Sequence, residues 1–318
     1  MGRNGVIIML DAIIIGPSKV GKSALVASLR HASDVATIID NKLTIRTIPK
    51  NKATREIFGQ GLEIVRKGDM PFGGTSLDVR YDFVIEVEQE PTSNWERFAA
   101  LWNANEHEGR FRFMDAPGGT IFSDDIKEKA RTDPVFARMV QQMLDSSGLI
   151  MCVDMTDALE TNPAKIKKIQ EYYRECFGFF LSCGFQITVP FDRVCFVLTK
   201  ADLYLEQSGK AVTEQTLLEQ EHHPFEIVKK IIGNKSLEAL TVFLEPHSQV
   251  CFSTTSVYGF LNGKENPHFK KKNSIIRPEE WQPYNVAESF AFIMTGEKHH
   301  PSQYILSYDD LFQFVKNI

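Results

Sequence analysis

Cysteine is scarce in this sequence, and none of it stands in a CxxC pair. The five cysteines are an odd number, and three of them lie inside apolar, strand-like runs: Cys152, Cys195 and Cys251. A disulfide framework uses cysteines in pairs, and a thiolate metal site needs closely spaced ones, so we predict neither. We expect buried free thiols in a reducing compartment.

Long hydrophobic runs and an excess of positive charge are also missing. No apolar run in the 318 residues is long enough to span a bilayer, and the apolar N-terminal stretch lacks a small-residue cleavage pattern. A formal net charge of -5 gives no electrostatic reason to expect nucleic acid as a partner. We therefore expect a cytoplasmic globular protein of one large domain or two.

The chain is organised around residues 16–23, GPSKVGKS, which follow the apolar run Ala12 to Ile15. This matches GxxxxGK[ST], the phosphate-binding P-loop pattern. Glycines let the backbone N–H groups surround phosphate oxygens, and the following helix adds its positive N-terminal end. Lys22 is expected to neutralise the β- and γ-phosphates, and the Ser23 hydroxyl suits Mg²⁺. The loop residues expected to contact nucleotide are Gly16, Ser18, Lys19, Val20, Gly21, Lys22, Ser23 and Ala24.

A second motif, DAPG at residues 115–118, closes the strand-like run Phe111 to Met114. A carboxylate at Asp115 can hold Mg²⁺ through water, and the N–H of Gly118 can reach a γ-phosphate. The same tetrapeptide is also a common turn sequence. Its position after the P-loop favours the phosphate interpretation.

A third motif, TKAD at residues 199–202, follows the buried run Val194 to Leu198 and selects the base. The Asp202 carboxylate can accept hydrogen bonds from N1–H and the exocyclic amine of guanine, a donor pair that adenine lacks. The aliphatic stem of Lys200 can lie along the base plane, and Thr199 precedes it. The alternative is a surface turn with a helix cap at Asp202. Further along, we expect either base support or capping of a following helix from Ser253, Thr254 and Thr255.

Hydrophobic periodicity predicts the elements between these motifs. It indicates helices over 22–29, 54–67 and 163–183. It indicates strands over 35–39, 43–48, 81–87 and 149–154, with a further strand ending at residue 252. The first strand, the P-loop and the first helix come in the order that phosphate binding requires.

Over roughly residues 6–262, the chain resembles the translation-factor and Ras-like class of P-loop GTPases. The resemblance rests on five features in this order: GPSKVGKS, a candidate switch threonine at Thr75, DAPG, TKAD and STTS. The resemblance implies an α/β fold with a doubly wound, mostly parallel sheet and insertions. It also implies GTP or GDP and Mg²⁺ as ligands, and slow hydrolysis coupled to two switch segments. By the same resemblance, Lys22, Thr75 and Gly118 are the catalytic residues, and the Mg²⁺ ligands are Ser23, Thr75 and Asp115. Ser76 and Thr54 are alternatives to Thr75.

More narrowly, the chain resembles the stand-alone GTPases of bacterial conflict and defence operons. This resemblance rests on MPFGGT at 70–75 and on EWQP at 280–283 followed by VAESF at 286–290. The alternative is a packing tryptophan and an ordinary helix. One departure concerns mechanism, because Ras-like enzymes place a water-positioning glutamine where this chain has Gly119. Arg80, Asp78 or a partner protein remain candidates for that role.

We therefore expect a P-loop GTPase domain over residues 1–261 and a C-terminal extension over 262–318 packed on the same domain. The expected function is a GTP-hydrolysing molecular switch. The alternative is an interaction module that holds GTP or GDP with little turnover. An effector or activating protein is expected, no nucleic acid or transmembrane segment is expected, and a nucleotide-dependent dimer is left open. The histidine pairs at 222–223 and 299–300 are expected to be solvated surface residues without a metal site.

Overall fold

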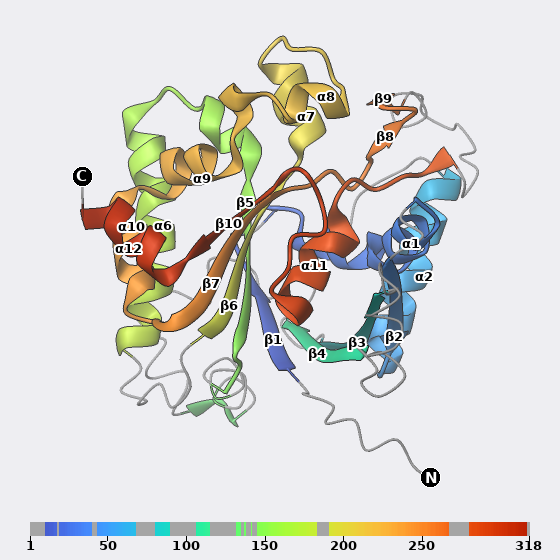
Figure 1. The fold of residues 1–318 in the computed structure, drawn as a ribbon, viewed down its shortest axis with the longest axis horizontal. Helices are drawn as coiled ribbons and strands as arrows, with labels where there is room; N and C mark the ends of the chain where they lie inside the picture. The colour runs from blue at the N-terminus through green and yellow to red at the C-terminus, as the bar shows by residue number, and fades with distance from the viewer. Residues whose placement is uncertain are drawn as a thin grey trace, which may run out of the picture.

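Strands from almost the whole length of the chain form one eight-stranded sheet (Figure 1). The computed structural model describes residues 10–17, 19–39, 43–67, 80–89, 106–114, 132–134, 137, 141, 145–182, 191–266 and 280–316. Across the sheet the strand order is β10-β7-β6-β5-β1-β4-β3-β2, and β8 and β9 form a separate two-stranded hairpin.

The strands are β1 (Leu10–Ile15), β2 (Leu43–Pro49), β3 (Arg80–Gln89), β4 (Glu106–Met114), β5 (Gly148–Asp154), β6 (Phe191–Thr199), β7 (Leu244–Thr254), β8 (Phe260–Leu261), β9 (Lys264–Glu265) and β10 (Gln303–Ser307). The α-helices are α1 (Lys22–Ile39), α2 (Lys52–Lys67), α6 (Pro163–Ser182), α7 (Ala201–Gln207), α8 (Glu214–Leu217), α9 (Pro224–Ile232), α10 (Asn234–Thr241), α11 (Val286–Thr295) and α12 (Tyr308–Lys316). The described residues also include two short 3₁₀ helices, η1 (Met155–Leu159) and η2 (Gln220–His222).

The centre of the sheet is parallel and its margins are antiparallel. Strands β4, β1, β5, β6 and β7 run parallel to one another. The hairpin partners β3 and β2 run antiparallel on one side, and β10 runs antiparallel on the other. The predicted α/β class with a mostly parallel sheet is confirmed.

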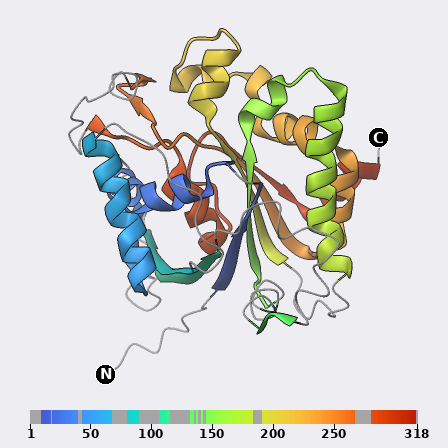
Figure 2. The same cartoon turned by 180° about the vertical axis from the view of Figure 1, so that it is seen from behind.

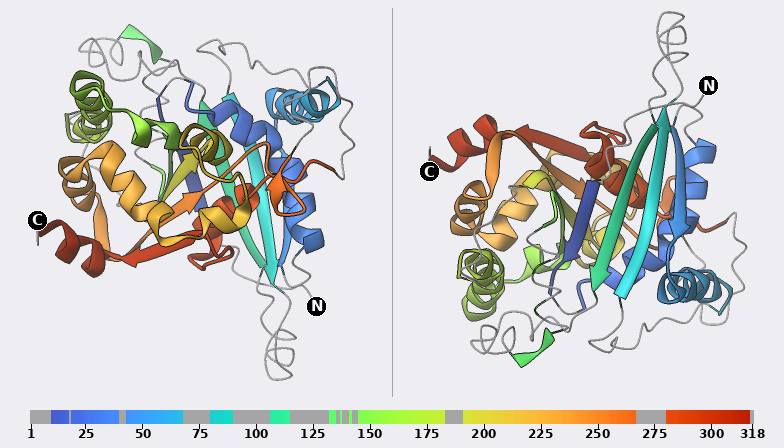
Figure 3. Two further views of the ribbon diagram at one scale, coloured as in Figure 1. Left: turned by 90° about the horizontal axis from the view of Figure 1, so that it is seen from above. Right: turned by 90° about the horizontal axis from the view of Figure 1, so that it is seen from below.

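Helices cover both faces of this sheet. One hydrophobic cluster joins residues of β1, β3 and β6 to α1, α2 and α11, and a second joins the opposite sides of the central strands to α6, α9 and α10. Figures 2 and 3 show these two layers from behind and along the sheet, with β1, β4, β3 and β2 side by side. The sheet is thus doubly wound. After β1 the chain forms β2, β3 and β4 on one side of it and then places β5 on the other side. The carboxyl end of β1 is therefore the switch point, where α/β folds bind ligands.

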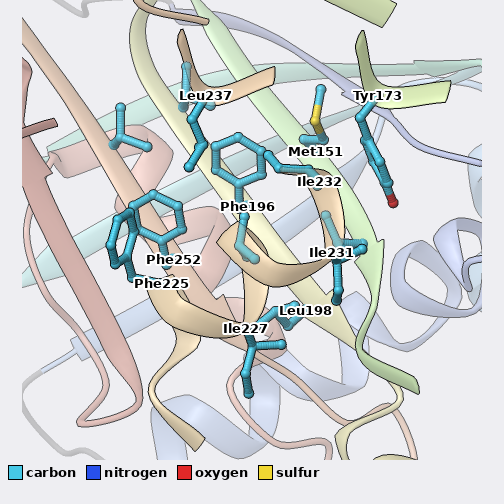
Figure 4. Packing of buried hydrophobic residues seen from close by; sticks show 14 of the residues in the cluster. Met151, Tyr173, Phe196, Leu198, Phe225, Ile227, Ile231, Ile232, Leu237 and Phe252 are labelled. Carbon is cyan, nitrogen blue, oxygen red and sulfur yellow. The ribbon is translucent and has the colours of Figure 1, made fainter. Parts of the chain in front are cut away.

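Aromatic packing fixes the β6–β7 half of the sheet (Figure 4). The rings of Phe196 and Phe252 stack with centroids 5.3 Å apart, and Phe225 of α9 meets Phe252 edge-on at 5.0 Å. Pro224 begins α9 at a position where a missing N–H costs nothing, so its apolar face follows directly. This half of the sheet carries the end of β6, where the TKAD motif begins.

Two expectations about elements are wrong or incomplete. The predicted strand at 35–39 does not exist, because α1 continues unbroken from Lys22 to Ile39. The β-branched residues there suggested a strand, but their preference is weak, and α1 packs along α2, β2 and α11. The antiparallel strand β10 was not anticipated.

In the described part of the chain, no helix combines the length and apolarity required to cross a membrane.

Candidate functional site

The P-loop leaves the carboxyl end of β1 and enters α1 at Lys22. Gly16 has φ +153°, and a Cβ on it would lie 2.7 Å from the carbonyl oxygen of Cys152 in β5. Gly21 has φ +100°, and Lys19 is left-handed at φ 66° with its side chain exposed. These conformations make a tight curve between β1 and the helix. The sequence therefore places glycine where a side chain would collide with the neighbouring strand.

The ammonium group of Lys22 is turned back over this curve. Its Nζ donates hydrogen bonds to the carbonyl oxygens of Gly16, at 2.9 Å, and Pro17, at 2.7 Å, and the residue is only 5% exposed. Val20 is buried, while Ser23 and Ala24 are partly buried in the first turn of α1. A cation, a hydroxyl and a helix N-terminus thus meet at the carboxyl edge of the sheet. This combination suits a polyanion.

The TKAD motif is bonded directly to the P-loop. The Thr199 hydroxyl donates to the carbonyl oxygen of Val20 at 2.6 Å, across 179 positions of sequence, and lies 3.2 Å from the carbonyl oxygen of Val153. Thr199 ends β6 and is 2% exposed. The hydroxyl therefore ties together the loop after β1 and the ends of β5 and β6.

Asp202 lies in the first turn of α7, partly buried, beyond the end of β6. Its Oδ1 accepts a hydrogen bond from the Ser256 hydroxyl at 2.7 Å, and the Ser256 oxygen in turn accepts one from the Gly259 N–H at 3.0 Å. Burial raises the pKa of Asp202, and the bond from Ser256 works in the opposite direction. A partly buried carboxylate of this kind favours a ligand that presents hydrogen-bond donors.

Lys200 adopts a left-handed conformation at φ 60° and forms an ion pair with Asp154 at the end of β5. Asp154 also accepts a hydrogen bond from the Thr156 hydroxyl at 2.6 Å. Asp157 lies in the following 3₁₀ helix, where burial, and then the charge of Asp154, raise its pKa to about 6. The ion pair holds the ammonium group of Lys200 at the end of β5. The stacking of its stem on a base stays a prediction.

The predicted contact residues after β7 face the protein interior. Ser253, Thr254 and Thr255 are 0% exposed, the first two within β7. The Ser253 hydroxyl is 2.6 Å from that of Ser289 and accepts a bond from Asn285 Nδ2 at 2.8 Å. No helix follows this segment directly, so the capping alternative is wrong. Ser256, which stands next in the sequence, is the residue that reaches Asp202.

Trp281 connects this segment to α1. It is 2% exposed, its ring stacks on His31 with centroids 4.6 Å apart, and its Nε1 donates to the carbonyl oxygen of Val257 at 2.7 Å. The Gly259 φ is +68°, and a Cβ there would collide with the backbone of Gln282. The tryptophan packs rather than projecting, which agrees with the packing alternative.

Four predicted site residues lie outside the described residues: Ser18, Thr75, Asp115 and Gly118. The expectation about the histidines is wrong for one of them, because His222 is only 3% exposed. Within the described ranges, four free cysteines are buried as predicted, Cys152, Cys176, Cys195 and Cys251.

Comparisons with known proteins place the chain only broadly. No protein-family model matches it, and no curated protein does. Among solved structures it is similar to the signal recognition particle receptor SRb-GTP/SRX complex from Chaetomium thermophilum, at 14% sequence identity and a TM-score of 0.37. That similarity covers 81% of this chain and 94% of the other. At this identity and TM-score the likeness identifies no family and shows no function of this chain.

Proposed function

We propose that this chain binds guanine nucleotide, hydrolyses GTP slowly and acts as a molecular switch. The observation that carries the proposal is the bond from the Thr199 hydroxyl to the Val20 carbonyl, which holds the phosphate-type loop and the base-type motif at one edge of the sheet. Two motifs that merely coincided in sequence would have no reason to be bonded in space. Parallel strands bring them together because their carboxyl ends share an edge.

The phosphate end has the donors that a triphosphate requires. Lys22 already lies over the loop, and the carbonyl oxygens of Gly16 and Pro17 that it contacts are weaker acceptors than phosphate oxygens. The Ser23 hydroxyl, at the start of α1, is a hard oxygen ligand of the kind that Mg²⁺ prefers. Thr75 and Asp115 are proposed as its further ligands from the sequence alone. When bound, Mg²⁺ would neutralise charge on the β- and γ-phosphates.

The base end has an acceptor for a donor pair. Asp202 accepts a hydrogen bond from the Ser256 hydroxyl and is also hydrogen-bonded by the backbone N–H groups of Asp202 and Leu203, while burial disfavours its charge. The N1–H and amino group of guanine would supply two donors to this carboxylate, whereas adenine has no such pair. The stem of Lys200, whose ammonium group pairs with Asp154, is proposed to cover the ring.

Slow turnover follows from the residue after the DAPG motif. Gly119 has no side chain to orient an attacking water, so Lys22 and the Gly118 N–H are the proposed contributions of this chain to the γ-phosphate. Stimulation by an activating protein that brings a cation is therefore part of the proposal, and an effector would read the state of the switch segments. If GTP is bound but not cleaved under any condition, the alternative function applies, a module that holds nucleotide without turnover.

We also propose that residues 262–318 extend the same domain. Strand β10 pairs with β7 along the sheet, and the 261/262 boundary falls within the turn between β8 and β9. The narrower resemblance to GTPases of bacterial conflict operons stays a prediction, since it rests on short sequence patterns.

The test is a change of base preference. Asp202→Asn replaces an acceptor pair with one acceptor and one donor, which suits xanthine because xanthine carries an oxygen where guanine carries its amine. We expect GTP affinity to fall about 10- to 100-fold and XTP affinity to rise, since hydrogen bonds to charged groups contribute about 1.5–3 kcal/mol.

Two variants complete this experiment. Asp192→Asn, at the opposite end of β6, is the matched control and should bind GTP as the unchanged chain does. Lys22→Ala should lose both GTP and XTP binding, because it removes the phosphate cation common to both ligands. Undiminished GTP binding by Asp202→Asn would refute the base assignment.

A further inference from the structure

A second cluster of ligating side chains lies away from the P-loop, between α8 and α9. Its members are Glu219, Glu221 and His222, and one ligand atom from each lies within 4.8 Å of the others. The 3₁₀ helix η2 brings these near-consecutive residues together, and after His223 the next helix, α9, begins at Pro224. None of them belongs to the proposed nucleotide site.

The histidine is buried and directed at the glutamates. His222 is 3% exposed, while both glutamates are exposed. Its Nε2 is buried, lies 3.3 Å from Oε1 of Glu221 and makes no hydrogen bond. A buried ring nitrogen without a hydrogen-bond partner is costly, and a cation held between this nitrogen and the glutamate oxygens would remove that cost.

The other ring nitrogen is held by a tyrosine. Nδ1 of His222 is 3.3 Å from the hydroxyl of Tyr204, and the two rings meet edge-on with centroids 5.5 Å apart. With the proton on Nδ1 donated to Tyr204, the lone pair of Nε2 faces the carboxylates. Metal-binding histidines are oriented in this way by a partner on their second nitrogen.

We propose that Glu219, Glu221 and His222 bind a zinc ion. One imidazole and two carboxylates form a mixed nitrogen and oxygen set that suits Zn²⁺, whereas Ca²⁺ and Mg²⁺ prefer oxygen ligands alone. Three protein ligands leave the fourth tetrahedral position to water. The exposed glutamates give the ion a path from solvent to the buried nitrogen.

Lys210 is the built-in competitor for this site. Its Nζ lies 2.6 Å from Oε1 of Glu221, so the ammonium group already partly neutralises that carboxylate. Zinc binding must displace Lys210 or use the second oxygen of Glu221. Removing this cation with Lys210→Gln should therefore tighten zinc binding, because it ends both the competition for Glu221 and the repulsion of the metal ion.

The experiment is calorimetric titration of the purified full chain with ZnCl₂, in excess Mg²⁺ so that the Ser23 hydroxyl does not compete for zinc. We expect one equivalent to bind. Glu219→Gln and Glu221→Gln should each weaken binding by more than about tenfold, and Tyr204→Phe should weaken it through loss of the Nδ1 partner, about 10- to 100-fold. Glu238→Gln, an exposed glutamate on α10, is the matched control and should not change it.

The glutamate variants keep the test decisive even if substitution of the buried His222 prevents folding. Co²⁺ in place of zinc gives a second readout, because visible absorption of a tetrahedral nitrogen and oxygen site should appear in the unchanged chain and disappear in Glu219→Gln. Absence of saturable zinc uptake, or equal affinity in the unchanged chain and both glutamate variants, would overturn the proposal.

Discussion

The hydroxyl of Thr199 donates a hydrogen bond of 2.6 Å to the carbonyl oxygen of Val20, joining the end of β6 to the middle of the P-loop. Thr199→Val keeps the shape of the side chain but removes the donor, leaving buried acceptors on Val20 and Val153. We expect a loss of about 1–2 kcal/mol in the free energy of unfolding and weaker nucleotide binding, because the loop loses its anchor. Chemical denaturation and nucleotide titration measure the two effects.

Thr199→Ser is the matched control, since it retains the hydroxyl and loses only a methyl group. It should bind nucleotide nearly as well as the unchanged chain. Equal nucleotide affinity in the valine and serine variants would show that the bond does not position the loop.

Gly16 and Gly59 should respond in opposite ways to alanine. At Gly16, φ is +153° and a Cβ would lie 2.7 Å from a backbone oxygen of β5, so Gly16→Ala should destabilise the fold by about 1–3 kcal/mol. Gly59 is exposed in α2 with nothing within 4 Å of a built Cβ, so Gly59→Ala should stabilise it by about 0.5–1 kcal/mol. Denaturant midpoints compare the pair, and a harmless Gly16→Ala would contradict the described loop geometry.

Asp157 should make the folded protein less stable as pH rises, which is the opposite of the usual effect of an ion-paired carboxylate. Burial, and then Asp154, raise its pKa to about 6, above its value of about 4 in an unfolded chain. The folded state therefore holds the proton more tightly, and this residue's contribution to stability falls as pH rises from about 4 to 6. Asp157→Asn should raise Tm at pH 7.5 and have a smaller effect at pH 5.

Thermal unfolding at those two pH values checks this prediction. Asp309→Asn, an exposed carboxylate in the first turn of α12, serves as the control and should shift Tm by similar amounts at both. A Tm change in Asp157→Asn that is equal at both pH values, or a greater loss of stability at pH 7.5, would count against the described surroundings of Asp157.

The buried thiols should be unreactive in the folded protein. Cys152, Cys176, Cys195 and Cys251 are all buried, and burial raises the pKa of the Cys176 and Cys195 thiols, so little reactive thiolate forms. Of the five cysteines, at most Cys183 should react quickly with an aromatic disulfide reagent. All five should react in denaturant, and rapid native labelling of two or more would contradict the burial.

The sequence supported the sheet and the phosphate loop well because their signals are local. Buried parallel strands such as β5 and β6 are continuous apolar runs, and GxxxxGKS has a fixed spacing. The same local reasoning failed at residues 35–39, where β-branched residues continue a helix that packs on three other elements. Propensity is a weak preference, and tertiary packing decided the outcome.

The candidate site was predicted less completely, because part of it depends on contacts between distant segments. Asp202 and Lys200 could be placed at a strand end, but the partner of Asp202 is Ser256, 54 positions away. The buried amide of Asn285, which donates to Ser253 and Ser302, lies between the two short patterns at 280–283 and 286–290 and belongs to neither. His222 seemed an exposed surface residue because its burial by Tyr204 is a tertiary contact.

The proposal that this chain binds and slowly hydrolyses GTP is tested most directly by equilibrium binding of GTP and ATP to the purified chain, with and without Mg²⁺. Single-turnover hydrolysis of the bound nucleotide follows. A site that reads guanine through Asp202 should bind GTP about 100-fold more tightly than ATP, because adenine leaves this partly buried acceptor without its donor pair. Binding should need Mg²⁺, and cleavage should be slow. Equal or tighter binding of ATP would contradict the assignment of TKAD and, with it, the proposed function.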